Sequence, residues 1–246
     1  MSKTFIRWGN GKNVLIFLHY FGGNANCWKW VADEISAEFT CIAIDMSSFG
    51  NRVSFKHHSI LNFALITKSI IEKLGIKKYS LIGHSMGGKI ALQLAAIDQR
   101  IIKNIVLLAP SPPGMEAISI AIRLQLSKKP AIEEANNIIS SLTFNPLSKI
   151  QLETAINAQL ETTESMRKWW VYIGTKQSII NQLSKIKSPI LVLCSKSDPA
   201  ISYNLLETRV MPLLKKSKLI EIKNSGHLYP LESANCVAAW LAKMCN

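Results

Sequence analysis

The sequence is poor in acidic residues and has no long apolar run. It contains 16 Asp and Glu against 29 Lys and Arg, so its net charge is +13 over 246 residues. No stretch of 18 uncharged apolar residues occurs, so we expect no integral membrane segment. The first residues, Met1 to Arg7, show no apolar segment typical of a signal peptide, so we expect a cytoplasmic protein.

The basic residues do not form the patterns that accompany nucleic-acid binding. They are scattered singly or in pairs such as Lys77-Lys78 and Lys215-Lys216, without a basic tract interleaved with aromatics. We therefore expect a solvated basic surface, a small-molecule substrate and no nucleic-acid partner. A weak electrostatic association with membranes, a preference for anionic substrates, and the choice between monomer and homodimer stay open.

Cysteine usage excludes a disulfide framework. The chain has five cysteines, an odd number, and no C-x-x-C motif. Cys41 and Cys194 lie inside apolar runs that are typical of strands. We expect buried free thiols, no disulfide and no metal site.

Short apolar runs alternate with helical patterns along most of the chain, which predicts a mostly parallel sheet covered by helices on both faces. The glycines around Asn10 predict a tight reversal after the first run. Residues 115–181 instead carry only helical periodicity. The predicted organisation is an α/β core over 1–114 and 182–246 with a helical cap inserted at 115–181. Predicted strands cover 4–8, 14–18, 40–44, 79–82, 101–108, 189–194 and 217–222, and predicted helices cover 28–37, 59–74, 118–126, 131–142, 151–161, 164–173, 203–214 and 231–244.

A G-x-S-x-G motif joins one predicted strand to a helix, with Ser85 between Gly83 and Gly87. A sharp strand-to-helix turn exposes the hydroxyl at its apex, and the residues two positions away must be small to avoid a collision. A structural turn is the alternative. The apolar runs on both sides favour Ser85 as a nucleophile.

A serine nucleophile needs a base and a residue that orients the base. His227 follows the predicted strand at 217–222 in the loop Asn224-Ser225-Gly226-His227, and we assign it as the base. Asp198 follows the strand at 189–194, and we assign it as the orienting carboxylate. An Asp before a proline is also a common turn or cap residue, so this alternative stays open.

The oxyanion that forms on attack requires N–H donors. Met86 begins the helix after the serine, so its amide can supply one donor. We assign the second donor to the amide of Phe21, in the glycine-bearing loop His19-Tyr20-Phe21-Gly22-Gly23 that follows a predicted buried strand.

Four ordered motifs resemble those of the α/β-hydrolase fold superfamily, in its branch with small helical caps. They are the loop at His19–Gly23 (H-G-x-G-G in the family), the motif around Ser85, Ser197-Asp198 and Gly226-His227. The resemblance spans almost the whole chain, with the order serine, aspartate, histidine that the fold requires. It implies catalysis without a cofactor, and Ser85 places the chain with hydrolases rather than dehalogenases or epoxide hydrolases.

Two departures from the family are visible. Tyr20 stands where the family has glycine, which alters the oxyanion loop. The stretch Asp45-Met46-Ser47-Ser48-Phe49-Gly50-Asn51 lacks the basic residue of the family pattern. The cap is expected to form most of the pocket, whose predicted substrate-binding residues are Tyr20, Met115, Trp169, Ile201 and Leu228.

These residues predict a serine hydrolase of a small to medium, largely apolar ester or thioester. A non-catalytic or single-turnover ligand-binding receptor on the same fold is one alternative. C–C hydrolysis, acyl transfer and perhydrolysis are others, because the same triad serves all of them.

Overall fold

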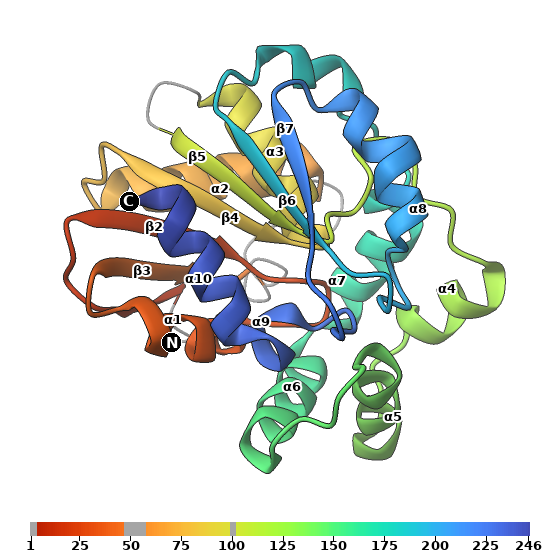
Figure 1. The fold of residues 1–246 in the computed structure, drawn as a ribbon. Helices are drawn as coiled ribbons and strands as arrows, with labels where there is room; N and C mark the ends of the chain where they lie inside the picture. Colours follow the sequence, from red (N-terminus) through yellow and green to blue (C-terminus); the bar gives the residue numbers. More distant parts are fainter. Residues whose placement is uncertain (1–3, 47–57, 99–101) are drawn as a thin grey trace.

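The structure is a computed structural model, and it describes residues 4–46, 58–98 and 102–246. The described strands form one sheet in the order β1-β3-β2-β4-β5-β6-β7 (Figure 1). Only β1 is antiparallel to its neighbour, and every other pair is parallel. The predicted mostly parallel sheet is therefore confirmed. The strands are β1 (Phe5–Trp8), β2 (Asn13–Leu18), β3 (Phe39–Ile44), β4 (Tyr79–His84), β5 (Ile102–Leu108), β6 (Ile190–Cys194) and β7 (Ser217–Glu221).

The helices cover both faces of the sheet. Figure 1 shows α1 and α10 in front of the strands and α2 and α3 behind them. Outside the connection between β5 and β6 the α-helices are α1 (Lys29–Ile35), α2 (Ile60–Lys73), α3 (Met86–Ile97), α8 (Tyr203–Leu205), α9 (Tyr229–Glu232) and α10 (Ala234–Cys245). Between β5 and β6 lie α4 (Ile120–Ser127), α5 (Ile132–Leu142), α6 (Lys149–Glu161) and α7 (Glu164–Trp169), which continues as the π-helical turn η5 (Trp170–Gly174).

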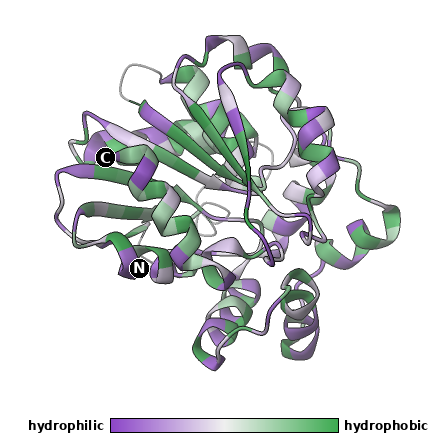
Figure 2. Ribbon diagram, viewed as in Figure 1, coloured by the Kyte–Doolittle hydropathy of each residue, from purple (hydrophilic) through white to green (hydrophobic). Residues whose placement is uncertain are grey.

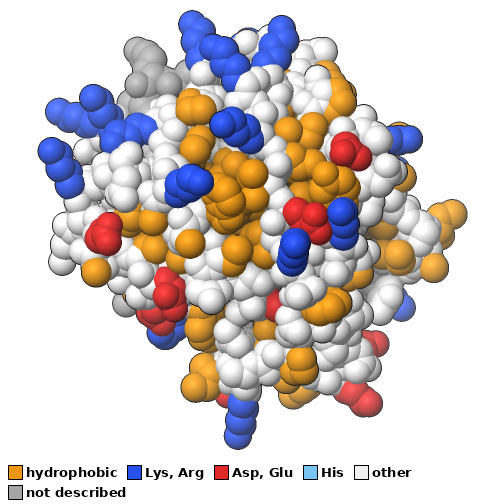
Figure 3. All heavy atoms as spheres, viewed as in Figure 1, with side chains coloured by type: hydrophobic (Ala, Val, Ile, Leu, Met, Phe, Trp, Pro, Cys, Tyr) orange, Lys and Arg blue, Asp and Glu red, His pale blue; other side chains and the backbone are white. Residues whose placement is uncertain are grey.

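The central strands are apolar because they are buried on both sides. Every residue of β3, β4 and β6 is buried, and Figure 2 shows the central strands mostly in the hydrophobic colour. Burying one Leu or Ile side chain stabilises the fold by about 1.5–3 kcal/mol. The helices carry hydrophobic and hydrophilic residues in alternation (Figure 2), and α4 exposes apolar side chains such as Ile120 and Leu124. On the face drawn in Figure 3, Lys and Arg side chains lie singly or in small groups.

Local sequence signals set several element boundaries. The side chain of Ser59 accepts a hydrogen bond from the Asn62 amide and caps α2, as its position predicts. Two predicted helices are less regular than expected. The segment 203–214 is a short α8 followed by the turns η7 (Leu206–Val210) and η8 (Met211–Leu213), because Pro212 cannot donate to a continuous helix. The predicted last helix is divided at Ser233, whose hydroxyl donates to Ser225 Oγ over 2.9 Å.

The reversal around Asn10 forms without a hairpin. β1 and β2 run in opposite directions, but β3 lies between them and bonds to both. A methyl group at Gly9 would lie 2.2 Å from the Ser36 carbonyl oxygen, and one at Gly11 would lie 1.9 Å from that of Glu38. These glycines therefore permit close packing of the turn against the end of α1. The predicted loop between β3 and α2 lies largely outside the described residues.

Candidate active site

Ser85 sits at a strained turn between β4 and α3. Its φ of 51° and ψ of −116° are unusual for a residue with a side chain. The turn is held by backbone hydrogen bonds, with the Ser85 amide donating to Leu108 O over 2.9 Å and the Ser111 amide donating to Ser85 O over 3.0 Å. A methyl group at Gly87 would lie 2.4 Å from Leu18 O, and one at Gly83 would lie 2.6 Å from Gly87 O. The glycines are therefore required by packing.

His227 and Asp198 are brought together by loops that follow β7 and β6. His227 Nδ1 lies 2.9 Å from Asp198 Oδ2, so the ring donates its Nδ1 proton to the carboxylate. The other carboxylate oxygen accepts from the amides of Ala200 and Ile201 at 2.8 and 2.9 Å. Burial raises the pKa of Asp198, but the charge and hydrogen bond of His227 and the two amides together lower it below its usual value. The carboxylate thus stays ionised and holds His227 with Nε2 free.

Two further residues fix this pair, and sequence reasoning missed both roles. Tyr229 donates its hydroxyl to Asp198 Oδ2 over 3.1 Å. His84 Nε2 donates to the backbone oxygen of His227 over 2.8 Å. Burial, reinforced by the nearby His227, lowers the pKa of His84 well below its usual value. The neutral His84 ring therefore acts as a spacer between the serine turn and the histidine loop; its position beside Ser85 was the only available signal.

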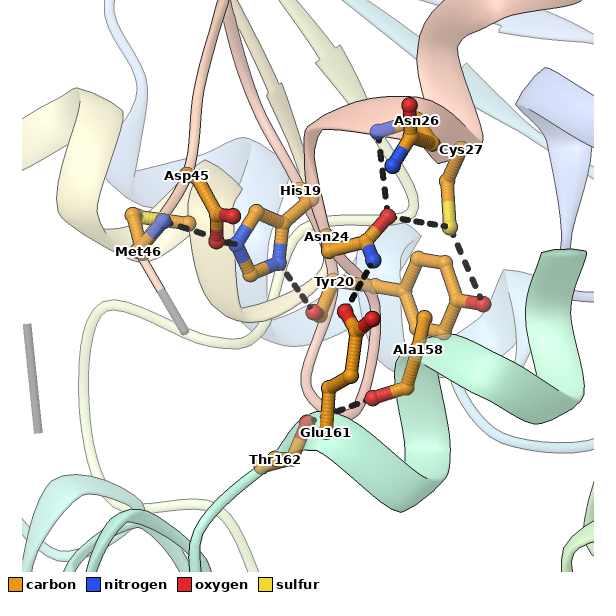
Figure 4. Close-up of polar contacts among 10 residues, drawn as sticks. All are labelled: His19, Tyr20, Asn24, Asn26, Cys27, Asp45, Met46, Ala158, Glu161 and Thr162. Atoms are coloured by element: carbon orange, nitrogen blue, oxygen red, sulfur yellow. Dashed lines mark hydrogen bonds and ion pairs between the residues drawn. The ribbon is translucent and has the colours of Figure 1, made fainter. Parts of the chain in front are cut away.

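Hydrogen bonds to the Tyr20 carbonyl and to the His19 ring hold the loop after β2 (Figure 4). His19 Nδ1 donates to Tyr20 O over 2.8 Å, and the Gly23 amide donates to the same oxygen over 3.0 Å. His19 Nε2 accepts from the Met46 amide, and burial lowers the pKa of the ring, so this tautomer is neutral. A trans peptide points its N–H opposite to its carbonyl. The Phe21 N–H therefore points away from the His19 ring.

Tyr20 stands where the family has glycine, and its side chain packs beside the loop. Its ring lies 5.1 Å from the His84 ring, and its hydroxyl accepts a weak 3.7 Å hydrogen bond from Cys27 Sγ (Figure 4). A methyl group at Gly23 would lie 2.7 Å from the Tyr20 ring, so that glycine makes room for it. Of the family stretch without its basic residue, only Asp45 and Met46 lie within the described residues.

One cavity of about 540 Å³ connects these groups with the inserted helices. Ser85 and His227 both line it, as do the predicted residues Tyr20, Phe21, Met115 and Ile201. Residues that we did not predict also line it, namely Ser111, Glu116, Ala117, Ile118, Ser119, Ile122, Gln125, Leu126, Ile138, Ser141, Leu142, Gln159, Trp170, Pro199, Ala200, Leu205 and Arg209.

Two predicted pocket residues do not line the cavity. Trp169 is fully buried and stacks on Phe63 with ring centroids 4.4 Å apart, whereas Trp170 lines the cavity and stacks on Phe21. Consecutive helical residues point about 100° apart, so only one of the two tryptophans can face the cavity. Leu228 packs instead into a small apolar cluster with Tyr20 and Cys27. Met86 contributes its amide at the start of α3, and its side chain lies in the main core.

The cavity is also lined by a partly buried acid, Glu116, that the sequence did not indicate. Burial raises the pKa of Glu116, while a hydrogen bond from Ser111 and the nearby charges of Lys89, His227 and Arg123 lower it. Its Oε2 has no hydrogen-bond partner among the described residues. The cavity is therefore less uniformly apolar than predicted.

Metal and cysteine chemistry gain no support from the described part of the chain. No cluster of three or more His, Cys, Asp or Glu side chains there could hold a metal ion. The five cysteines are free thiols, and all but Cys236 are buried. No described helix has the length and apolar character needed to cross a membrane.

Known proteins share this arrangement of elements. A family model described as the alpha/beta hydrolase fold matches residues 13–131. The solved esterase from Exiguobacterium antarcticum superposes with a TM-score of 0.83 at 14% identity, covering 97% of this chain and 93% of that one. The chain therefore has the α/β-hydrolase fold.

Two curated relatives show the range of reactions among similar α/β-hydrolases. A 2-succinyl-6-hydroxy-2,4-cyclohexadiene-1-carboxylate synthase from Serratia proteamaculans is 24% identical over 75% of this chain and 76% of its own length. A 2-hydroxy-6-oxononadienedioate/2-hydroxy-6-oxononatrienedioate hydrolase from Klebsiella pneumoniae is 23% identical over 92% of this chain and 85% of its own length. The shared fold therefore does not decide which of these reactions the site supports.

Proposed function

We propose that this protein is a serine hydrolase that cleaves a small to medium carboxylic ester or thioester through an acyl-enzyme. The observation that carries the proposal is the shared cavity: Ser85 and His227 line it, and Asp198 holds His227 at 2.9 Å. The strained turn at Ser85 adds support, because such strain concentrates at functional sites.

In the proposed mechanism, Ser85 Oγ attacks the carbonyl carbon and its proton passes to His227 Nε2. The amides of Phe21 and Met86 stabilise the oxyanion. The C–O or C–S bond then breaks, and the leaving group takes the proton from His227. Water, activated by His227, hydrolyses the acyl-enzyme and restores Ser85. Asp198 stabilises the imidazolium in both steps.

Residues 115–181 act in this proposal as a cap, inserted into a core of 1–114 and 182–246. The support is that residues of α4, α5 and α6 line the cavity together with Ser85. The cap supplies many apolar walls, which favours a largely apolar substrate. We also propose that the enzyme acts on a small molecule in the cytoplasm, without a cofactor, as a monomer or homodimer.

The test is labelling of the purified protein with a fluorophosphonate, followed by a 4-nitrophenyl ester chain-length series. Labelling should map to Ser85 and be lost in both Ser85→Ala and His227→Ala. Ester turnover should fall by at least about a thousandfold in Ser85→Ala. Turnover unchanged in that variant would refute the proposal. Stoichiometric binding of a ligand without turnover would instead favour the receptor alternative.

Hydrolysis of a C–C bond is the second candidate, because the curated relatives of this chain include C–C hydrolases. A vinylogous 1,5-diketone tested beside the esters separates the two reactions. Greater kcat/KM for the diketone would assign the triad to C–C cleavage.

A further inference from the structure

Arg167 is a buried cation in the inserted helices without a nearby carboxylate. Its side chain is fully buried on α7, and no described Asp or Glu lies within salt-bridge distance of it. Burial lowers its pKa to about 10. Its Nη2 donates to the backbone oxygen and to Oε1 of Gln159, both over 2.7 Å. A buried charge is costly unless its hydrogen bonds are satisfied, so these contacts to Gln159 stabilise Arg167.

This contact fixes the orientation of the Gln159 amide. A guanidinium carries only donors, so the amide oxygen must face Arg167 and the NH₂ group must face away. Gln159 Nε2 has no hydrogen-bond partner in the described part of the chain. This nitrogen is also not one of the polar atoms that are completely buried without a partner. Gln159 is only 3% exposed yet lines the cavity. Its free N–H groups therefore face the cavity, polarised by the positive charge behind the amide.

The amide lies against the oxyanion loop. A methyl group at Gly22 would lie 2.4 Å from Gln159 Nε2, so the amide rests directly on the backbone of the residue after Phe21. Gly22 has a φ of +80°, which a side chain rarely adopts. Arg167 also stacks over the Phe21 ring at 5.7 Å. One buried arginine thus positions both the loop and the amide beside it.

We propose that Gln159 forms a hydrogen-bond donor subsite for a second carbonyl oxygen of the substrate, close to the scissile carbonyl. The proposal deepens the proposed hydrolase function and rests on it. An all-alkyl substrate would exclude water from the polarised N–H and offer it no acceptor. The lost hydrogen bond would weaken the binding of such a substrate. The substrate class is therefore an ester or thioester that also carries an oxo group.

Paired esters test the subsite on each side of the scissile bond. The acyl pair is 4-nitrophenyl 4-oxopentanoate and 4-nitrophenyl pentanoate, and the alcohol pair is 2-oxopropyl butanoate and butyl butanoate. In one pair, wild-type kcat/KM should be about tenfold higher for the oxo ester after correction for spontaneous hydrolysis. That ratio should fall to about one in Gln159→Met, which keeps the chain length and removes the donor.

Two further variants separate donation from packing. Gln125→Met makes the same change elsewhere in the cavity, and the oxo-to-alkyl ratio should stay near ten. Gln159→Glu keeps the shape and pairs with Arg167, so it should fold even if Gln159→Met does not. Its carboxylate repels a carbonyl oxygen, so the ratio should fall below one. A ratio unchanged in Gln159→Glu would overturn the subsite.

Failure of the subsite and failure of the hydrolase function give different results. Equal kcat/KM within both pairs, with turnover that depends on Ser85, overturns the subsite alone. If no ester is hydrolysed, the hydrolase proposal fails, and calorimetry of the Ser85→Ala protein decides the subsite. Methyl 4-oxopentanoate should then bind about tenfold more tightly than methyl pentanoate, and equal affinities would overturn the subsite.

Discussion

The sheet and the inserted helices are stabilised in different ways. Strands β4, β5 and β6 are almost wholly buried, and the backbone around the serine turn is packed so closely that Gly87 leaves no room for a side chain. The inserted helices instead expose large apolar side chains, such as Ile120 at 77% and Ile132 at 68%. The position of Ser85 thus depends on the backbone geometry of the sheet. The wall of the cavity depends instead on a segment in which few residues are buried.

Side-chain hydrogen bonds attach this segment to the core. Glu232 Oε1 accepts from the amides of Phe144 and Asn145 at 2.8 and 2.6 Å, while its Oε2 accepts from the Gly226 amide beside His227. Asn24 Nδ2 donates to Glu161 over 2.8 Å (Figure 4). Such contacts tolerate sequence change better than a packed sheet, so the wall of the cavity can change while the proposed triad stays in place.

Lys89 joins both ends of the segment to the helix that follows Ser85. Its Nζ donates to Gly114 O over 2.9 Å and to Gly174 O over 3.3 Å, although the side chain is fully buried. Burial lowers its pKa to about 8, and the charge of Glu116 partly opposes this shift. The two regions are therefore coupled through a group that titrates just above neutral pH.

The difference between the sheet and the inserted helices should have its largest effect on kcat when a carboxylate is changed to an amide. Asp198→Asn should lower kcat for a 4-nitrophenyl ester by about 10⁴-fold, because an amide no longer holds His227 in the required tautomer. Glu161→Gln, the matched change in the inserted segment, should lower it less than about tenfold, since Asn24 still finds an acceptor. Steady-state kinetics checks both variants. Similar losses would contradict the division between the two regions.

Glycine substitutions should show the next largest contrast. Gly87→Ala should lower the free energy of unfolding by more than about 3 kcal/mol, because the added methyl meets the backbone oxygens of Leu18 and His19. Gly114→Ala should cost less than about 1 kcal/mol, because its methyl meets only the flexible end of Ile180 at 3.2 Å. Urea unfolding followed by circular dichroism measures both, and equal costs would refute the comparison.

Lys89 should give the smallest effect, visible as a pH dependence. Between the folded pKa of about 8 and the higher unfolded value, the unfolded chain binds a proton that the folded chain has released. Stability from this group therefore rises with pH, by about 1 kcal/mol from pH 8 to pH 9. The difference between wild type and Lys89→Met in urea unfolding isolates this term. A difference that stays constant or falls with pH would show that Lys89 titrates elsewhere.

Local patterns predicted the elements well because their causes are local. The Ser59 cap, the strand before Ser85 and the glycines around it depend on neighbours within a few residues. The same patterns could not choose between Trp169 and Trp170, because adjacent apolar residues look alike in sequence. They also missed Tyr229, which reaches Asp198 only after two loops meet.

By itself the sequence determined the fold, the strained turn at Ser85 and the chain order of the proposed triad, since each follows from short-range backbone rules. Only the tertiary structure decided which other residues form the walls of the cavity. Gln159 faces the oxyanion loop only because Arg167 pins its oxygen and Gly22, far away along the chain, leaves room for its amide. Contacts of this kind depend on how distant segments pack, so the hydrophobic periodicity of either segment cannot predict them.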